Sequence, residues 1–518
     1  MTYIDILSLT MGNTPNVANL TVVVEVIAKE KDNQMKYLKP VFFILIVILS
    51  GCQNSEVKFE DAFCIENITT IDADNGLKPN QTLIIKEGKI HQITPSQELQ
   101  LSKENTIIDG TGKFLIPGLW DAHVHFAYME ELAPRMFDLF LAYGITSVRD
   151  TGGEIGFVNT WKQKSLANPT STPRVMIAGP LLDGTPNVYD GSDPGHPALS
   201  VGLNTLEDVK EQINKLEIQG VDFLKAYEML SPEQFALIAK LGKEKGLKVT
   251  GHVPLSMDVI SASNAGLNSM EHLRNLELSC ASNAEELLQQ RQESLRSGKD
   301  MKGAALRSKI HQDQREIAID NYDENKAQEV LNVLAANDTW QIPTLTLNTA
   351  STKLPFAEMD FKESFKFLPK TVEDDWNQGI DKLSNRDISA ANIKRTEWTL
   401  NITEKMHKSG INIMAGTDCP IFYLTPGRSL HQELVLLVEA GLTPLEALRT
   451  ATLNPAKYFN LEDELGTIEE GKWADLVILN ANPLEDIKNT TRIDGVIKQG
   501  NYFDSHKLDQ KLKRLDEE

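Results

Sequence analysis

The chain has 518 residues, of which 41% are hydrophobic and 24% are charged, a composition typical of a folded protein and a length that suits two domains. Lys and Arg total 52 against 73 for Asp and Glu, so the net charge of −21 argues against a nucleic-acid partner. The cysteines, Cys52, Cys64, Cys280 and Cys419, are too few and too scattered for a disulfide framework, so any metal would need histidine and carboxylate ligands.

An apolar run at residues 41–49 is too short to cross a membrane as a helix. It follows a basic start at Met35 and leads into Leu49-Ser50-Gly51-Cys52. This order resembles a bacterial lipoprotein signal peptide, which implies cleavage before Cys52 and lipid attachment to its thiol. We therefore expect a protein of the bacterial cell envelope, facing the periplasm or the exterior and touching the membrane through its lipid anchor. The alternative is a buried strand followed by a chance cysteine.

Residues 1–34 have no basic or apolar pattern of their own, whereas a signal peptide begins at the start of a chain. We therefore interpret Met35 as the true start and residues 1–51 as a leader that contains the signal peptide.

Both ends of the remaining chain have the pattern of short strands. Around Gly88, apolar and polar residues alternate on both sides of a turn, which predicts a hairpin within residues 58–116. Similar runs recur in residues 461–504. These two segments are predicted to form one small β domain, followed by a charged tail at residues 505–518.

Between these ends, residues 117–460 alternate short apolar runs with helices, the pattern of a parallel sheet covered by helices. Ser231 and Thr443 each begin a predicted capping box with proline at the next position. Eight strands are predicted, which favours a closed α/β barrel. They are expected to end near His125, Asp150, Leu182, Tyr227, Val253, Leu273, Leu347 and Asp418.

One segment interrupts this alternation. Residues 281–321 are rich in charged and amide side chains and contain no strand-like run. We expect a solvated helical insertion over the mouth of the barrel, with disorder as the alternative.

The strongest chemical signal is the pair His123 and His125. Residues two apart on a strand point to the same face, so both imidazoles can reach one ion. His252, His272 and Asp418 also end predicted strands, and the carboxyl ends of barrel strands share one face. The five side chains are therefore expected to converge, although a single histidine at a strand end is more often an ordinary core residue.

Several motifs together resemble the amidohydrolase superfamily, and in particular its members around imidazolonepropionase and the prolidase-like dipeptidases. They lie at residues 117–125, 415–418, 430–434, 442–448, 451–456 and 466–476. The resemblance covers about residues 64–503. It implies a (β/α)8 TIM-like barrel with a small β-sandwich built from both chain ends.

The resemblance also assigns roles to the converging residues. His123 and His125 would bind a first metal ion, His252 and His272 a second, and Asp418 would bind the first and transfer protons. Lys225 would be carbamylated and bridge the two ions, because a charged amine beside two cations is strongly disfavoured. The alternatives are that Lys225 is a neutral amine, or that its side chain points away from the ions into solvent at the barrel mouth.

The implied reaction is hydrolysis of an amide C–N bond by a metal-activated hydroxide, with zinc expected and iron or manganese as alternatives. A prolidase-like dipeptidase is the first interpretation, with a dipeptide or another small molecule as substrate. The alternatives are a mononuclear cyclic-amide hydrolase or deaminase of the imidazolonepropionase type, and a metal-free binding lipoprotein; a homo-oligomer is left open. Tyr227, His196 and Arg149 are the candidate substrate-binding residues, each weighed against a packing or solvated role.

Overall fold

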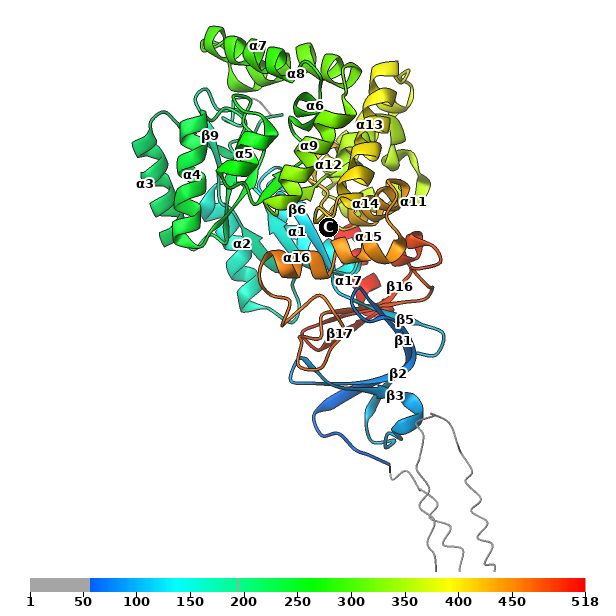
Figure 1. Cartoon of the computed structure of the whole chain (residues 1–518). Coiled ribbons are helices and arrows are strands. Elements are labelled where there is room, and N and C mark those ends of the chain that lie inside the picture. The colour runs from blue at the N-terminus through cyan, green and yellow to red at the C-terminus, as the bar shows by residue number, and fades with distance from the viewer. Residues whose placement is uncertain (1–55, 193–194, 518) are drawn as a thin grey trace, which may run out of the picture. The chain divides into compact units, whose positions relative to one another are not determined.

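The computed structural model describes residues 56–192 and 195–517. The leader and Cys52 lie outside the described residues. Within the described ranges, every helix is too short or too polar to span a membrane. Figure 1 shows the elements of the unit formed by residues 54–518.

The two chain ends pair in one eight-stranded sheet, in the order β17-β16-β15-β5-β1-β2-β3, with β4 beside β1. In this sheet β15 runs antiparallel to β5, with Leu476 opposite Pro117, so the blue and red segments of Figure 1 join there. Its strands are β1 (Ala62–Asp72), β2 (Gly76–Lys86), β3 (Lys89–Pro95), β4 (Thr106–Asp109), β5 (Phe114–Pro117), β15 (Leu476–Leu479), β16 (Ile493–Lys498) and β17 (Asn501–Asp504). The expected partnership of the two ends is present as one continuous sheet, and a two-layer sandwich is not confirmed.

The predicted hairpin is formed by β2 and β3, which pair antiparallel up to Lys86 and Lys89. The turn residues Glu87 and Gly88 both have positive φ, at 52° and 78°. Such a two-residue turn matches the right-handed twist of the flanking strands. Leu83, Ile85 and other alternate apolar residues of the hairpin are buried, which fixes the register of pairing.

The parallel strands of the middle segment form two sheets. The six-stranded sheet has the order β10-β9-β11-β12-β13-β14, and the three-stranded sheet the order β6-β7-β8. The strands are β6 (Leu119–Val124), β7 (Ile145–Asp150), β8 (Arg174–Ile177), β9 (Leu181–Gly184), β10 (Ser200–Leu203), β11 (Phe223–Ala226), β12 (Lys248–Gly251), β13 (Ser269–Glu271) and β14 (Trp340–Ile342). The α/β class is confirmed.

A closed eight-stranded barrel is not confirmed within the described residues. The predicted eighth strand before Asp418 contributes only two isolated parallel bridges, at Ile413 and Cys419. Its backbone leaves the extended conformation at Asp418, where φ is 67°. The chain also turns at Gly179, with φ of 73°, which separates β8 from β9. The strand expected to end near Leu347 ends earlier, at Ile342.

The helices are α1 (Ala133–Ala142), α2 (Ile155–Ala167), α3 (Leu206–Ile218), α4 (Pro232–Lys245), α5 (Val259–Ala265), α6 (Leu276–Ser279), α7 (Ala284–Ser297), α8 (Gly303–Asp320), α9 (Glu324–Ala336), α10 (Leu345–Lys353), α11 (Met359–Lys362), α12 (Lys370–Ser384), α13 (Ala390–Lys408), α14 (Arg428–Glu439), α15 (Pro444–Thr450), α16 (Leu453–Tyr458) and α17 (Ser505–Glu517). Both predicted capping boxes are confirmed: Ser231 begins α4 and Thr443 begins α15.

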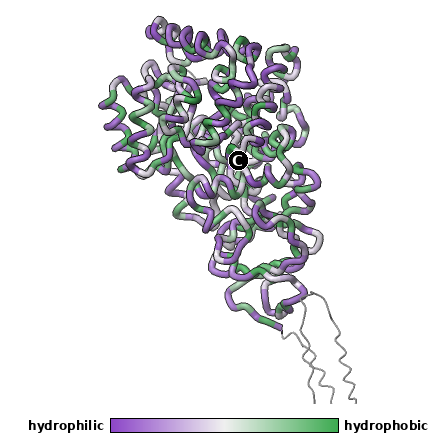
Figure 2. Tube along the Cα trace, in the orientation of Figure 1, coloured by the Kyte–Doolittle hydropathy of each residue, from purple (hydrophilic) through white to green (hydrophobic). Residues whose placement is uncertain are grey.

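The polar segment at residues 281–321 contains two helices, α7 and α8. Figure 2 shows that α7 is largely hydrophilic. The segment is not wholly solvated, because α8 buries Leu306, Ile310 and His311. The insertion therefore contributes side chains to the interior of the protein.

The charged tail forms the helix α17, which packs against α1. Leu508 and Leu515 are buried on one face. On another face, Lys511 and Arg514 both pair with Asp138 of α1. The tail sequence is charged because most of this helix faces solvent, while its apolar residues cover the end of α1.

Candidate active site

Four histidines and one aspartate lie together where parallel strands end. His123 lies in β6 and His125 directly follows that strand, while His252 and His272 come directly after β12 and β13. Asp418 lies in the loop that bridges to β6 through Cys419. All five side chains line one cavity of about 590 Å³.

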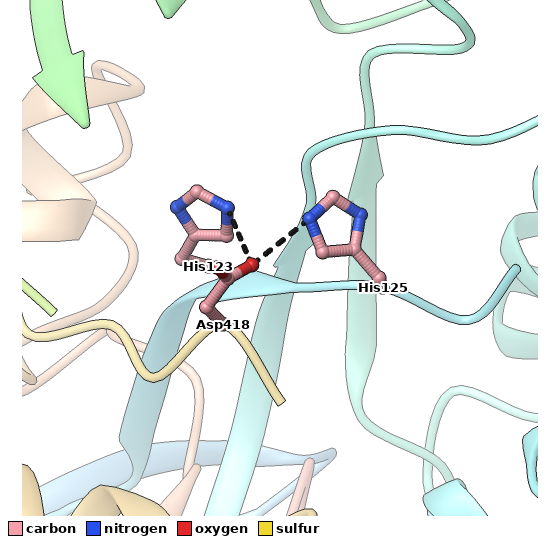
Figure 3. A group of neighbouring side chains, drawn as sticks. All are labelled: His123, His125 and Asp418. Atoms are coloured by element: carbon pink, nitrogen blue, oxygen red, sulfur yellow. Dashed lines mark ion pairs between the residues drawn. The ribbon is translucent and has the colours of Figure 1, made fainter. Parts of the chain in front are cut away.

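The Asp418 carboxylate is the centre of this cluster. Its Oδ1 atom lies 3.1 Å from His123 Nε2 and 3.0 Å from His125 Nε2, and Figure 3 shows both imidazoles turned toward it. Asp418 Oδ2 lies 3.5 Å from His272 Nε2. The ring centroids of His252 and His272 are 4.8 Å apart, so the two histidine pairs predicted from the sequence meet in one place.

Each imidazole is held through its Nδ1 atom. The partners are Glu271 for His123 at 2.6 Å, Gly152 O for His125 at 3.1 Å, Glu228 for His252 at 2.6 Å and Thr344 Oγ1 for His272 at 2.7 Å. With Nδ1 engaged, Nε2 is the atom left for a ligand. Metal-binding histidines are oriented by this arrangement, which fixes the ring and its tautomer.

Three buried polar atoms in the cluster have no hydrogen-bond partner: His123 Nε2, Asp418 Oδ1 and Lys225 Nζ. His123 Nε2 and Asp418 Oδ1 are close, but they are not aligned as a hydrogen bond. Buried polar groups without partners are costly. Nitrogen and carboxylate oxygen atoms that face one point are the ligand set that divalent metal ions accept, so the residues fit such an ion.

The backbone is strained at the cluster. Asp418 and His272 have φ values of 67° and 57°, a region that side chains other than glycine rarely adopt. The strained loop is held by Asp121, which accepts hydrogen bonds from the Thr417 backbone N–H at 3.0 Å and the Thr417 hydroxyl at 2.7 Å. Strain of this kind persists only where the surroundings enforce it, and it is common at functional sites.

Arg149 was expected to meet a substrate carboxylate, but it lies beneath the cluster and does not line the cavity. Its guanidinium donates to Glu271 Oε1 at 2.6 Å and to Ala122 O at 2.5 Å. Burial alone would raise the pKa of Glu271, but Arg149 and Lys225 hold it well below its ordinary value. Arg149 thus keeps Glu271 ionised, and Glu271 orients His123.

Lys225 and Tyr227 both reach the cavity from the end of β11. Burial lowers the pKa of Lys225 to about 8. The Tyr227 ring lies 4.2 Å from the His252 ring and 5.9 Å from Tyr189. His196 is half-buried outside the lining, with its ring 5.4 Å from Tyr189.

The sequence analysis missed a second buried carboxylate, Glu228, and the residues that surround it. Glu228 accepts from His252, and its Oε2 lies 2.6 Å from His311 Nε2 of α8. Arg307 Nε of α8 and Arg274 Nε lie 3.2 and 3.8 Å from Glu228 Oε1. The position of Glu228 beside Tyr227 at a strand end was a usable signal, whereas nothing in the spacing of α8 indicates that it reaches the site.

Comparison with known proteins agrees with this geometry. The model of the "Amidohydrolase family" matches residues 114–502. Ochratoxinase from Aspergillus niger is 42% identical over 83 residues, which are 16% of this chain and 16% of that protein. Imidazolonepropionase from Fusobacterium nucleatum subsp. nucleatum is 30% identical over 114 residues, 20% of this chain and 26% of that protein. The matched segments thus span about a sixth to a quarter of these relatives.

Among solved structures, a Xaa-Pro dipeptidase with bound methionine has a TM-score of 0.62 at 19% identity. The match covers 86% of this chain and 100% of that one, which shows a shared fold. Because the family model spans most of the described residues, including every strand that carries the cluster, the chain belongs to the amidohydrolase family.

Proposed function

We propose that the protein is a metal-dependent hydrolase of amide C–N bonds, and specifically a prolidase-like dipeptidase. The observation that carries this proposal is the buried cluster of His123, His125, His252, His272 and Asp418, whose side chains line one cavity. Within it, His123 Nε2 and Asp418 Oδ1 have no hydrogen-bond partner. The ochratoxinase, imidazolonepropionase and dipeptidase similarities support the same class of reaction.

We also propose that the two parallel sheets are arcs of one (β/α)8 barrel, with the eight-stranded sheet as its β-sandwich companion. The parallel bridges of Cys419 to Val124 and of Ile413 to Gln341 support this, since they connect β6 and β14 through the segment between them. A barrel of this kind places its chemistry at the carboxyl ends of its strands.

In the proposed site, His123, His125 and Asp418 would hold one ion, and His252 and His272 would hold a second. Zinc suits this ligand set, and iron or manganese would also be accepted. A divalent ion bound here would lower the pKa of water and polarise the substrate carbonyl. The donor atoms are buried at the cavity floor.

The residues of the chain supply the remaining steps. Asp418 accepts a proton from the attacking water and donates it to the departing nitrogen, so that the amine leaves neutral. The Tyr227 hydroxyl donates a hydrogen bond to the carbonyl oxygen of the substrate, as its position beside His252 allows. His196 supports Tyr189, which packs on Tyr227.

Lys225 decides whether the centre holds two ions. Its Nζ is buried without a partner beside the cluster, and its lowered pKa raises the fraction of the neutral amine, the form that reacts with carbon dioxide. Carbamylation would remove the charge and supply two oxygens for bridging. The second candidate function is a mononuclear cyclic-amide hydrolase or deaminase. It is favoured by the observation that, among the described residues, His123, His125 and Asp418 are the one group of at least three potential ligands whose atoms all lie within 4.8 Å of one another.

The Asp418→Asn variant should lower kcat/KM for dipeptides by about 10²- to 10⁴-fold, because it removes the group that moves the proton. The measurement is steady-state hydrolysis of a dipeptide panel by the metal-loaded protein, with circular dichroism to check the fold. Asp381→Asn, on exposed α12, is the matched control and should keep parental activity. A folded Asp418→Asn variant with parental activity would refute the proposed role.

The Lys225→Ala variant should lose about one metal equivalent per chain, because the bridge between two ions is removed. Added formate or acetate should restore part of the activity by replacing the missing carboxylate. Metal content by mass spectrometry and activity with and without these acids test the point. Lys248→Ala, at the start of neighbouring β12, should change neither; unchanged metal content and full activity in Lys225→Ala would favour the mononuclear alternative.

We propose that Cys52 carries a lipid anchor and that translation begins at Met35, on the sequence pattern alone. Mass spectrometry of the protein from the membrane fraction should find a mature terminus at Cys52 with the added mass of a lipid. Cys52→Ser should release the protein from the membrane. An unmodified Cys52 in that fraction, or an intact Met1 terminus, would contradict this proposal.

A further inference from the structure

One wall of the cavity is built from arginines that come from three separate segments. Arg274 follows β13, Arg307 and Arg315 lie on α8, and Arg395 lies on α13. We call these four residues the arginine wall. Only Glu316 and Lys394 add charge at its exposed rim among the described lining residues, and their charges are opposite.

Two carboxylates lie against the arginine wall. Glu228 is shared by Arg307 and Arg274 and also binds two histidines, so its oxygens are already engaged. Glu277 is 3.2 Å from Arg315. Four guanidinium groups against two carboxylates leave two positive charges uncompensated at the cavity.

Arg395 is the clearest uncompensated cation. Its Nη2 donates to Asn348 Oδ1 at 3.2 Å. Among the described residues, Arg395 has no ion pair with an acidic side chain. Arg274 Nε and Arg307 Nε are buried and lie 3.8 and 3.2 Å from Glu228 Oε1, but neither makes a hydrogen bond to a described residue. Arg395 is half-buried and has no ion pair, so an anionic ligand there would offset the cost of desolvating its charge.

The arginine wall also has two parts. All four arginines line the main cavity, and Arg274, Arg315 and Arg395 also line a small adjoining hollow with Glu277 and Asn348. Arg307 faces the main cavity and does not line the hollow. Within the main cavity, two anionic groups a few bonds apart can therefore meet Arg307 and Arg395 separately. Each carboxylate can accept two parallel hydrogen bonds from one guanidinium.

We propose that the arginine wall binds an acidic amino acid as the leaving group, so that the preferred substrates are dipeptides or N-acyl amino acids that end in aspartate or glutamate. This inference rests on the proposed function. In the reaction the amide C–N bond breaks, the hydroxyl of water joins the acyl carbon and its proton joins the nitrogen. The products are a carboxylic acid and the free acidic amino acid.

Binding of the product tests the wall independently of turnover. Calorimetry on the intact, metal-loaded protein should show L-glutamate binding about tenfold or more tightly than L-glutamine, the uncharged isostere, since charge-assisted hydrogen bonds to arginine are strong. Arg395→Gln should reduce this ratio to near one, and Arg395→Lys should keep part of it. Lys408→Gln, the same loss of charge at an exposed position at the end of α13, should leave it unchanged.

Equal binding of glutamate and glutamine, or an unchanged ratio in a folded Arg395→Gln variant, would overturn the proposal. Hydrolysis of Ala-Glu, Ala-Gln and Ala-Leu then separates the two claims. If the three are cleaved with equal kcat/KM, the acidic preference is wrong and the dipeptidase proposal stands. If glutamate binds selectively but none of a wider panel of dipeptides and N-acyl amino acids is cleaved, the proposed function is wrong and the anion site stands. Tighter binding of inorganic phosphate than of glutamate would contradict the proposed dicarboxylate ligand and would indicate that the arginine wall binds a phosphoryl group.

Discussion

Two fully buried carboxylates, Glu271 and Glu228, each orient one histidine of the site and connect it to the rest of the protein. An ionised carboxylate in a protein interior needs hydrogen-bond donors or cations as partners, because its desolvation is costly. Glu271 and Glu228 each contact a histidine of the cluster and at least one arginine. Glu271 connects His123 to Arg149 in the core beneath the strands. Glu228 connects His252 to Arg307 and His311 of the inserted helix α8.

This pairing explains how the inserted helices and the strands act as one structure. Burial alone would raise the pKa of Glu228, but Arg307 and His311 hold it well below its ordinary value, so the carboxylate stays ionised and accepts from His252. Loss of α8 would leave Glu228 with Arg274, at 3.8 Å, as its one arginine partner among the described residues. The insertion is thus coupled to the orientation of a ligand histidine through electrostatics.

The sequence predicted the site residues whose positions follow from the order of strands along the chain. His123, His125, His252 and His272 could be placed because residues at the ends of parallel strands share one edge. Arg149 could not be placed, because its position near a strand end does not say that its side chain points inward, against Phe223 and Tyr458. The sequence of residues 411–418 predicts a strand, but this segment pairs only through isolated bridges at Ile413 and Cys419. The positive φ of Asp418, 67°, is not compatible with a continuous strand.

The arginine wall could not be predicted from the sequence, for a different reason. Its members lie on segments whose contacts depend on how α8 and α13 pack, and no local pattern encodes that packing. Net charge was also a poor guide to the local field, since a chain of −21 has a cavity with excess positive charge. An acidic surface and a basic cavity are compatible, because fields in a cleft are set by the nearest groups.

The central claim is that the histidine cluster binds metal. Anomalous diffraction from crystals of residues 52–518 grown with zinc, recorded above and below the zinc absorption edge, tests it most directly. The account predicts an anomalous peak among His123 Nε2, His125 Nε2 and Asp418 Oδ1, with a second peak toward His252 and His272 if Lys225 is carbamylated. Strong zinc peaks elsewhere with none at these atoms would contradict it.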